Sequence, residues 1–393
     1  MKAHLLLWMC VFGMQGIFAQ SFVAGQRYAG PHGYVEYQAG NLPILISVPH
    51  GGYLQPAVIP NRNCTGCSYS RDSYTQELSR LLSDLLEQRT GCVPHMVINL
   101  LHRRKFDANR DIGEAADGDL TVEASWYAYH QFLDSAKARM VQEFGRGLFI
   151  DMHGHAHTIQ RVELGYTLSK SELQLPDSIL NQEVYMEESS IKHLVSHNLR
   201  RLTHAELLRG PQSLGSMLTQ QGVPAVPSED DPFPLTGEPY FSGGYNTQRH
   251  GSRGGGQIDG IQIECHQSIR FDSVVRGVFA DSLSMSLIRY IQWHYESGFP
   301  QNACRAVVQL EAETNPISIQ VYPNPVTTHL WLKGLKTGYR IQLFDVLGHM
   351  VWESIWEGEG IAVEKLPRGM YYLKFGQKGA QNGGIWMMKE NAK

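Results

Sequence analysis

Four short apolar runs, separated by longer segments with helical periodicity, constrain the fold of this chain more than any other feature of its sequence. The runs span residues 44–48, 97–101, 148–152 and 261–263. Continuous apolar runs of this length are typical of strands that are buried on both faces of a sheet. Between and after them, helices are expected at residues 78–86, 121–144 and 273–295. The alternation predicts an α/β fold in which helices enclose a sheet.

A change of pattern near Cys304 indicates a second domain. The chain has 393 residues, whereas single hydrophobic cores usually stop growing at about 250–300 residues. Beyond Cys304, apolar residues fall in short stretches between turn residues, at 317–321, 330–332, 339–344 and 370–375. This pattern is typical of a small all-β unit. We therefore predict a larger domain at residues 20–304, a linker at 305–315 and a β-sandwich at 316–393.

The N-terminus has the order of residues found in a secretory signal peptide. Lys2 is followed by an apolar stretch over residues 5–18 and then by Ala19, which is the usual sequence of charged, apolar and small residues. A membrane anchor is the alternative, but the stretch is short for a bilayer and Gly13 and Gly16 interrupt it. We expect cleavage near Ala19, passage through the periplasm, and a mature protein that is secreted or held at the cell surface.

The charge balance argues against a nucleic-acid partner. Lys and Arg number 34 and Asp and Glu 38, which gives a net charge of -4. Proteins that bind a phosphate backbone cluster their Lys and Arg side chains, and this sequence contains no such stripe. The 17 histidines are more informative, because several of them stand beside Asp and Gly at the ends of predicted strands.

The cysteines leave their pairing open. One of the 6 cysteines, Cys10, lies in the signal segment, and the others are Cys64, Cys67, Cys92, Cys265 and Cys304. An odd number in an oxidising compartment leaves at least one of them unpaired. The CxxC motif that begins at Cys64 fits a zinc half-site or a redox pair, but no second CxxC follows. A disulfide, within the motif or with Cys92, is the favoured interpretation.

Polar residues end three of the predicted strands. The segments are SVPHGG from Ser47, IDMHGH from Ile150 and IQIECH from Ile261. In open α/β sheets, sites form at the carboxyl ends of the strands, so His50, His153 and Glu264 are expected to converge. Two imidazoles and a carboxylate with one open position describe a catalytic zinc site.

The remaining zinc ligand is expected to be an acid from another segment, and Asp72 is the best candidate. Asp72 also precedes a predicted helix, where Asp is common as an N-cap, so the pattern leaves both roles open. His155 and His157 compete with His153 as ligands. Strand alternation places Asp151, His153 and His155 on one face, where Asp151 would be able to fix the tautomer of a ligating histidine.

Five segments in order resemble the N-formylglutamate amidohydrolase family. They are SVPHGG at Ser47, Asn109-Arg110 before Asp111, DMH at Asp151, GGYNTQRHG at Gly243 and IQIE at Ile261. The resemblance spans residues 44–272. That family is similar to the zinc carboxypeptidases, which implies a mixed sheet with helices on both faces and one bound zinc ion.

The resemblance also implies residue roles. The zinc ligands would be His50, Asp72 and His153. Glu264 would be the general base that accepts a proton from the attacking water. Asn109 and Arg110 would hold a carboxylate of the substrate, for which a guanidinium offers a bidentate fork. The implied enzyme is a secreted zinc-dependent amidohydrolase that cleaves an amide bond in a carboxylate-bearing substrate.

The segment 210–256 is rich in Gly and Pro and is expected to form a long loop over the site. Three of its residues, Tyr245, Arg249 and His250, are candidates for contacts with the oxyanion or the acyl group of the substrate.

Two departures from the family pattern concern the substrate. Cys265-His266-Gln267 stands where an Asn-Arg pair is usual, and residues 61–70 are inserted before Asp72. The substrate is therefore expected to be an N-acyl amino acid or resemble N-formylglutamate. The alternatives are a metallocarboxypeptidase, a cell-wall peptide amidase, or, from another class, a non-catalytic surface binding protein. Glu264 argues against a binding protein, which has little need of a base beside the metal position.

The C-terminal region carries a second resemblance. The segments VYPNP from Val321, LFDVLG from Leu343 and LPRGMYYL from Leu366 resemble a type IX secretion sorting domain. An ordinary β-sandwich binding module is the alternative. The resemblance implies a partner in the type IX secretion machinery and passage through an outer membrane.

Overall fold

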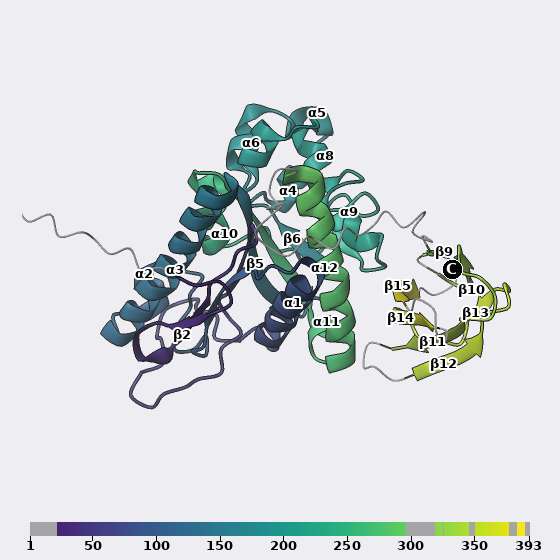
Figure 1. Ribbon diagram of the computed structural model, residues 1–393, viewed down its shortest axis with the longest axis horizontal. Coiled ribbons are helices and arrows are strands. Elements are labelled where there is room, and N and C mark those ends of the chain that lie inside the picture. The colour runs from purple at the N-terminus through teal and green to yellow at the C-terminus, as the bar shows by residue number, and fades with distance from the viewer. Residues whose placement is uncertain (1–21, 296–318, 325, 346–349, 377–382, 390–393) are drawn as a thin grey trace, which may run out of the picture.

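An eight-stranded sheet organises the larger part of the structure (Figure 1). The computed structural model describes residues 22–295, 319–324, 326–345, 350–376 and 383–389. The strand order is β1-β2-β4-β3-β5-β8-β6-β7. The strands are β1 (Arg27–Ala29), β2 (Val35–Gln38), β3 (Ile44–Val48), β4 (His95–Asn99), β5 (Gly147–His155), β6 (Val162–Gly165), β7 (Ala225–Val226) and β8 (Ile258–His266).

The sheet is mixed, with a parallel centre. Strand β3 pairs in parallel with β4 and β5, and β5 pairs in parallel with β8. Toward the edges, β2 runs antiparallel to β4, and β6 runs antiparallel to β8. The carboxyl ends of β3, β5 and β8 therefore meet at one edge of the sheet, where sites form in open α/β folds.

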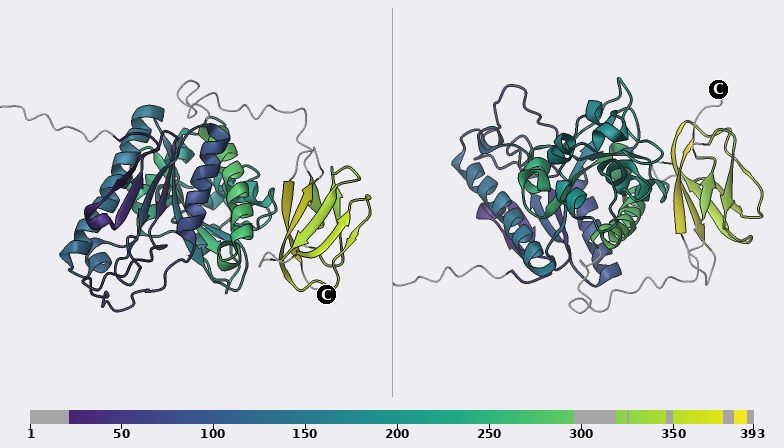
Figure 2. Two further views of the ribbon diagram at one scale, coloured as in Figure 1. Left: turned by 60° about the horizontal axis from the view of Figure 1, so that its bottom comes forward. Right: turned by 90° about the horizontal axis from the view of Figure 1, so that it is seen from above.

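Helices cover both faces of the sheet. Helices α1 (Thr75–Thr90) and α12 (Ser273–Tyr295) lie side by side on one face, and α3 (Leu120–Phe144) lies on the other (Figures 1 and 2). Ile44 and Ile46 of β3 belong to the core with α1 and α12, whereas Leu45 belongs to the core with α3. A strand with apolar neighbours on both sides is apolar throughout. The predicted mixed sheet with helices on both faces is confirmed.

Two strands extend beyond their apolar runs. Strands β5 and β8 each continue through polar residues and pair along their whole length, from Gly147↔Ile258 to His155↔His266. Sheet pairing satisfies the backbone groups of these residues, so the strands continue although their side chains are polar. Helix α3 also starts earlier than the sequence suggested, because Asp119 accepts hydrogen bonds from the amides of Thr121 and Val122.

The segment predicted as a long loop over residues 210–256 contains regular elements, so that prediction was wrong in part. Before this segment, after β6, lie α4 (Lys170–Leu173), α5 (Asp177–Leu180), α6 (Glu183–Glu188), α7 (Lys192–His197) and α8 (His204–Arg209). Within it lie α9 (Leu214–Thr219), β7, α10 (Tyr245–His250) and a short 3-10 helix (Ser252–Gly254). Apolar residues such as Leu214 and Leu218 bury α9 in the core, which explains why it is helical despite its Gly- and Pro-rich surroundings. The other short elements are a 3-10 helix at Pro31–Gly33, α2 (Ile112–Ala116) and α11 (Gln267–Arg270).

The C-terminal part is all-β, as predicted. Two antiparallel sheets have the orders β13-β10-β9 and β12-β11-β14-β15. Their strands are β9 (Gln320–Tyr322), β10 (His329–Lys333), β11 (Arg340–Phe344), β12 (Met350–Ile355), β13 (Ile361–Ala362), β14 (Gly369–Gly376) and β15 (Gly383–Lys389). Leu330, Ile341 and Leu373 are among the buried residues between them. The signal peptide and the linker at 305–315 lie outside the described residues, so those boundaries stay predictions.

Two further features bear on the sequence predictions. Among the described helices, none is long and apolar enough to cross a bilayer. Cys64 and Cys67 form a disulfide with each other, Cys92 is also disulfide-bonded, and Cys265 is free and buried. The favoured interpretation of the CxxC motif is therefore confirmed.

Candidate metal centre

The carboxyl ends of three central strands bring His50, His153 and Glu264 together. His50 follows β3, His153 lies near the end of β5, and Glu264 lies opposite His153 on β8. All three side chains are buried and line one cavity of about 610 Å³. Strands β3, β5 and β8 are neighbours in the sheet, which is why residues separated by more than a hundred positions share one site.

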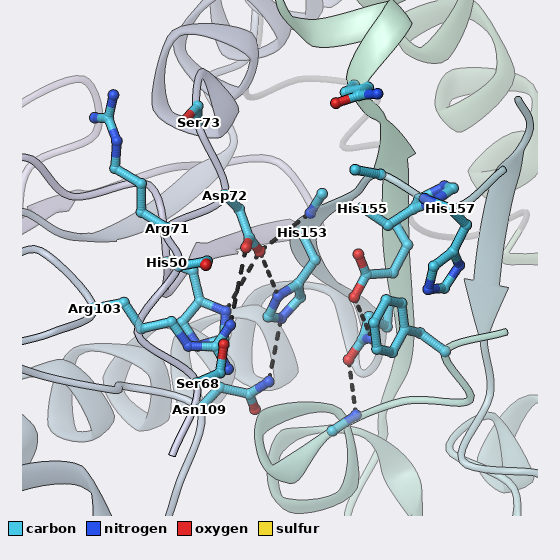
Figure 3. Close-up of a pocket in the computed structure, with 18 of the residues that line it drawn as sticks. His50, Ser68, Arg71, Asp72, Ser73, Arg103, Asn109, His153, His155 and His157 are labelled. Carbon is cyan, nitrogen blue, oxygen red and sulfur yellow. Dashed lines mark hydrogen bonds and ion pairs between the residues drawn. The ribbon is translucent and has the colours of Figure 1, made fainter. Parts of the chain in front are cut away.

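Asp72 completes the group from the segment between β3 and α1 (Figure 3). Its Oδ2 lies 3.1 Å from Nδ1 of His153 and 3.4 Å from Nδ1 of His50. The same oxygen accepts a hydrogen bond from the amide of Gly154 at 3.2 Å. The N-cap position of α1 is occupied by Tyr74, with no side-chain cap bond. The carboxylate of Asp72 is therefore directed at the histidines and does not cap the helix.

Two buried carboxylates fix the orientation of the imidazole rings. Nε2 of His50 lies 2.6 Å from Oδ1 of Asp107, and Nε2 of His153 lies 3.1 Å from Oδ2 of Asp151. Each ring thereby turns its Nδ1 atom toward Asp72. Metal-binding histidines commonly donate their second ring N–H to a carboxylate, which fixes the tautomer and raises the basicity of the ligand.

Asp107 is held ionised by its neighbours. Nε of Arg103 donates to Asp107 at 2.8 Å, and the amide of Asn109 donates to it at 3.1 Å. Burial raises the pKa of Asp107, but His50 and Arg103 outweigh burial and hold it below its usual range. Buried charges are tolerated only with such partners.

Asp151 is likewise held by hydrogen bonds. Ser47 donates to it at 2.7 Å and Thr247 of α10 at 3.2 Å. Burial raises the pKa of Asp151, but His153 outweighs burial, so the net shift is downward. Helix α10 thus supports the centre through Asp151.

The arrangement of His50, Asp72 and His153 fits a divalent metal ion. One potential ligand atom from each lies within 4.8 Å of the others. Nδ1 of His50 is buried and has no hydrogen-bond partner within the part of the chain that the structure describes. The pKa of His153 is raised well above its ordinary value, because Asp151 and Asp72 outweigh the effect of burial. The site therefore attracts positive charge, and two imidazoles with one carboxylate are a ligand set that suits zinc.

Two other groups of potential ligands in the described residues fit a metal less well. Cys64 and Cys67 lie near Glu114, but their sulfur atoms are joined in a disulfide. His155 and His157 lie near Glu163. Both ring nitrogens of His155 are already engaged, because Nε2 lies 2.9 Å from the Arg161 carbonyl and Nδ1 accepts from the His157 amide at 3.2 Å.

Glu264 presents a free carboxylate oxygen beside the histidines. Its Oε1 accepts from Nε2 of Gln262 at 3.0 Å, whereas Oε2 is buried and has no hydrogen-bond partner among the described residues. Burial raises the pKa of Glu264 to about 8, while His153 acts in the opposite direction. A carboxylate with a raised pKa is a stronger base than a solvated one.

The predicted substrate residues separate into two groups. Asn109 and Arg110 line the cavity, and Nδ2 of Asn109 lies 3.3 Å from Nε2 of His153. Tyr245, Arg249 and His250 are absent from the described lining. Tyr245 accepts from Arg249 at 2.9 Å, and His250 is fully buried. Residues of α10 instead contact Asn109 and Asp151, since the amide of Asn246 donates to Oδ1 of Asn109 at 2.7 Å.

The sequence assigned no individual role to Arg103 or Asp107. Arg103 lines the cavity, and its Nη1 lies 4.0 Å from Oδ1 of Asp72. Both residues stand within six positions of Asn109 in the segment RRKFDANRD that follows β4. The concentration of charge in that short segment was the available signal, because a chain rarely buries several charges unless they pair with one another.

Comparisons with known proteins describe the C-terminal part most directly. Residues 320–383 match the family described as secretion system C-terminal sorting domain. This match indicates export, in agreement with the second resemblance in the sequence. No curated protein matches the chain.

The larger domain of this chain is weakly similar to several solved structures. N-formylglutamate amidohydrolase from Ralstonia eutropha JMP134 is 12% identical, with a TM-score of 0.41, over 67% of this chain and 98% of that chain. Succinylglutamate desuccinylase from Chromobacterium violaceum is 11% identical, with a TM-score of 0.31, over 71% of this chain and 72% of that chain. Likenesses of this size do not bear on the chemistry of the site, which rests on its own geometry.

We predict that the protein binds one zinc ion per chain and that His153→Ala abolishes this binding. The variant removes one of the two imidazoles that face Asp72. Elemental analysis after zinc loading and dialysis measures the stoichiometry. His157→Ala is the matched control and should retain the metal. Zinc retained in His153→Ala but lost in His157→Ala would place the metal at the other histidine group.

Proposed function

We propose that this chain is an exported zinc-dependent hydrolase that cleaves an amide bond in a substrate carrying a free carboxylate. The observation that carries the proposal is the Oε2 atom of Glu264, which is buried beside the group of His50, Asp72 and His153 and has no hydrogen-bond partner in the described ranges. A protein that only binds a ligand has no evident use for a buried base at this position. The alternative of a non-catalytic surface protein is disfavoured for that reason.

The chain's own residues supply most of the chemistry. A zinc ion held by His50, Asp72 and His153 would supply Lewis acidity to the amide carbonyl and to water. Glu264 accepts a proton from the attacking water as the new carbon–oxygen bond forms. It then returns the proton to the amine nitrogen as the carbon–nitrogen bond breaks, which leaves a carboxylic acid and an amine.

Arg103 is placed to stabilise negative charge on the amide oxygen. Its guanidinium is largely buried and fixed by Asp107 at one nitrogen, with Nη1 near Asp72. A donor that is already oriented costs no rearrangement when charge develops during the reaction, and this makes such groups effective.

The arginines that line the cavity are the reason to expect a free carboxylate on the substrate. Arg71, Arg103 and Arg110 all line it. Arg110 is held by Glu114 at 2.9 Å and by the carbonyl of Asn109 at 2.9 Å. An oriented guanidinium suits a carboxylate, so we assign Asn109 and Arg110 to hold this group. N-acyl amino acids and peptides with a free C-terminus both meet the requirement, and the second would make the enzyme a metallocarboxypeptidase.

The proposed export rests on two segments, the predicted signal peptide and the C-terminal domain. We propose that the N-terminal signal peptide directs the protein to the periplasm and that the C-terminal domain is read by the type IX secretion machinery. The match of residues 320–383 to a sorting domain supports the second step. A hydrolase outside the cell would act on extracellular peptides or acylated amino acids.

Replacing the base tests the catalytic role. Glu264→Gln keeps the shape of the side chain but removes its ability to accept a proton. We expect kcat to fall by about 10² to 10⁴, measured on the best substrate from a screen of N-acyl amino acids and dipeptides, with zinc content unchanged. Loss of zinc in this variant would instead identify Glu264 as a ligand, and unchanged kcat would place the base elsewhere.

Blocking the substrate carboxylate tests the cationic side. We expect the C-terminal amide of the same substrate to lose about 10- to 100-fold in kcat/KM, mainly through KM, because a charged hydrogen bond is lost. Arg110→Met should lower activity on the free acid and shrink the difference between the two substrates. Equal kcat/KM for acid and amide in the wild-type enzyme would contradict the assignment of Asn109 and Arg110.

A further inference from the structure

The order of strands arranges the parts of the site in a line. His50 follows β3, His153 is on β5, Glu264 is on β8, and Glu163 is on β6, which pairs with β8 at Glu163↔Glu264. These four strands are consecutive in the sheet, with about 4.8 Å between neighbours. Figure 3 shows Arg103 on one side of His153 and His157 on the other. A substrate whose carboxylate is held on the arginine side therefore extends its other end toward β6.

An ordered aromatic surface lies at that end. His157 and Phe241 line the cavity, and their rings stack with centroids 4.7 Å apart and planes 21° from parallel. Nδ1 of His157 lies 2.8 Å from Oε1 of the buried Glu163. The other oxygen of Glu163 accepts from the amide of Phe241 at 2.8 Å. One buried carboxylate thus fixes both members of the stacked pair.

The loop that carries Phe241 is held by several hydrogen bonds and ion pairs. Arg161 donates to Asp231 at 2.8 Å and to Glu238 at 2.9 Å. The hydroxyl of Tyr240 donates to the Leu164 carbonyl at 2.6 Å. The aromatic surface is therefore formed before a ligand arrives, although Phe241 remains 44% exposed. Ligand pockets are lined mainly by apolar and aromatic side chains, with a few polar groups that fix orientation.

We propose that the Phe241–His157 pair is the subsite for the acyl group and that it selects a bulky aromatic or apolar acyl group over a formyl group. This inference rests on the proposed function, because the scissile amide is taken to lie between His153 and Glu264. Two facts favour a large group. The cavity measures about 610 Å³, within the range of about 300–1,000 Å³ typical of sites for whole small molecules. A formyl group would also leave the exposed ring of Phe241 without a contact.

Matched substrates test the inference. N-phenylacetyl and N-formyl derivatives of the same amino acids, for example glutamate, phenylalanine and lysine, share the carboxylate and differ only in the acyl group. We expect kcat/KM to be at least about tenfold higher for the phenylacetyl member of the best pair, the scale on which apolar pockets discriminate. Calorimetry on metal-free protein supplies a second readout that does not depend on catalysis, and the phenylacetyl compound should bind more tightly there too.

Variants of the loop locate the selectivity. Phe241→Ala should lower the phenylacetyl-to-formyl ratio of kcat/KM about tenfold, and Phe241→Leu, which keeps an apolar side chain, should restore part of it. Leu235→Ala is the matched control. Leu235 is also exposed and lies in the same loop, but it does not line the cavity, so the ratio should stay at the wild-type value.

The two proposals fail in different ways. Hydrolysis of the formyl compounds at equal or higher kcat/KM would overturn the acyl subsite and leave the proposed function intact. A ratio unchanged by Phe241→Ala would also overturn it. If none of these derivatives and none of the N-acyl amino acids and dipeptides in the screen is hydrolysed, the proposed function fails. Tighter binding of phenylacetyl compounds to wild-type protein, lost in Phe241→Ala, would then still support the subsite, and equal binding would overturn it as well.

Discussion

The carboxylate of Asp72 faces two imidazole rings whose outer nitrogens are already held by other carboxylates, and the rest of the site depends on this arrangement. Asp107 orients His50 and Asp151 orients His153. Arg103 in turn donates a hydrogen bond to Asp107, and Ser47 and Thr247 donate to Asp151, which holds those two carboxylates in place. Because every buried charge here needs a partner, the centre is complete only when β3, β5, α10 and the segment that follows β4 are packed together.

The sequence predicted the site best where its residues lie at the ends of strands. His50, His153 and Glu264 each follow an apolar run, and the rule that parallel strands end at one edge of a sheet was enough to bring them together. The roles of Arg103 and Asp107 could not be assigned, because they depend on partners supplied by distant segments. For Tyr245, Arg249 and His250 a local motif suggested contact with substrate, yet packing of α10 against α3 turns them away from the described lining. Burial and side-chain direction are tertiary properties that a motif does not encode.

The remaining parts of the chain agree with a catalyst that works outside the cell. The disulfide between Cys64 and Cys67 closes the segment that leads to Asp72. Arg62 donates to the Ser68 carbonyl within that segment at 2.9 Å and lies 3.5 Å from Asp107. The disulfide-closed segment is thereby joined to the carboxylate that orients His50. An oxidising compartment preserves such a bond, and the sorting domain at residues 320–383 indicates export to one.

Anomalous X-ray scattering at the zinc absorption edge, from crystals of the zinc-loaded protein, tests the central claim most directly. The arrangement of the residues predicts one strong peak within bonding distance of Nδ1 of His50, Nδ1 of His153 and a carboxylate oxygen of Asp72, at about 2.0–2.2 Å from each. A peak beside His157 and Glu163, or no peak in crystals grown with zinc, would contradict the account.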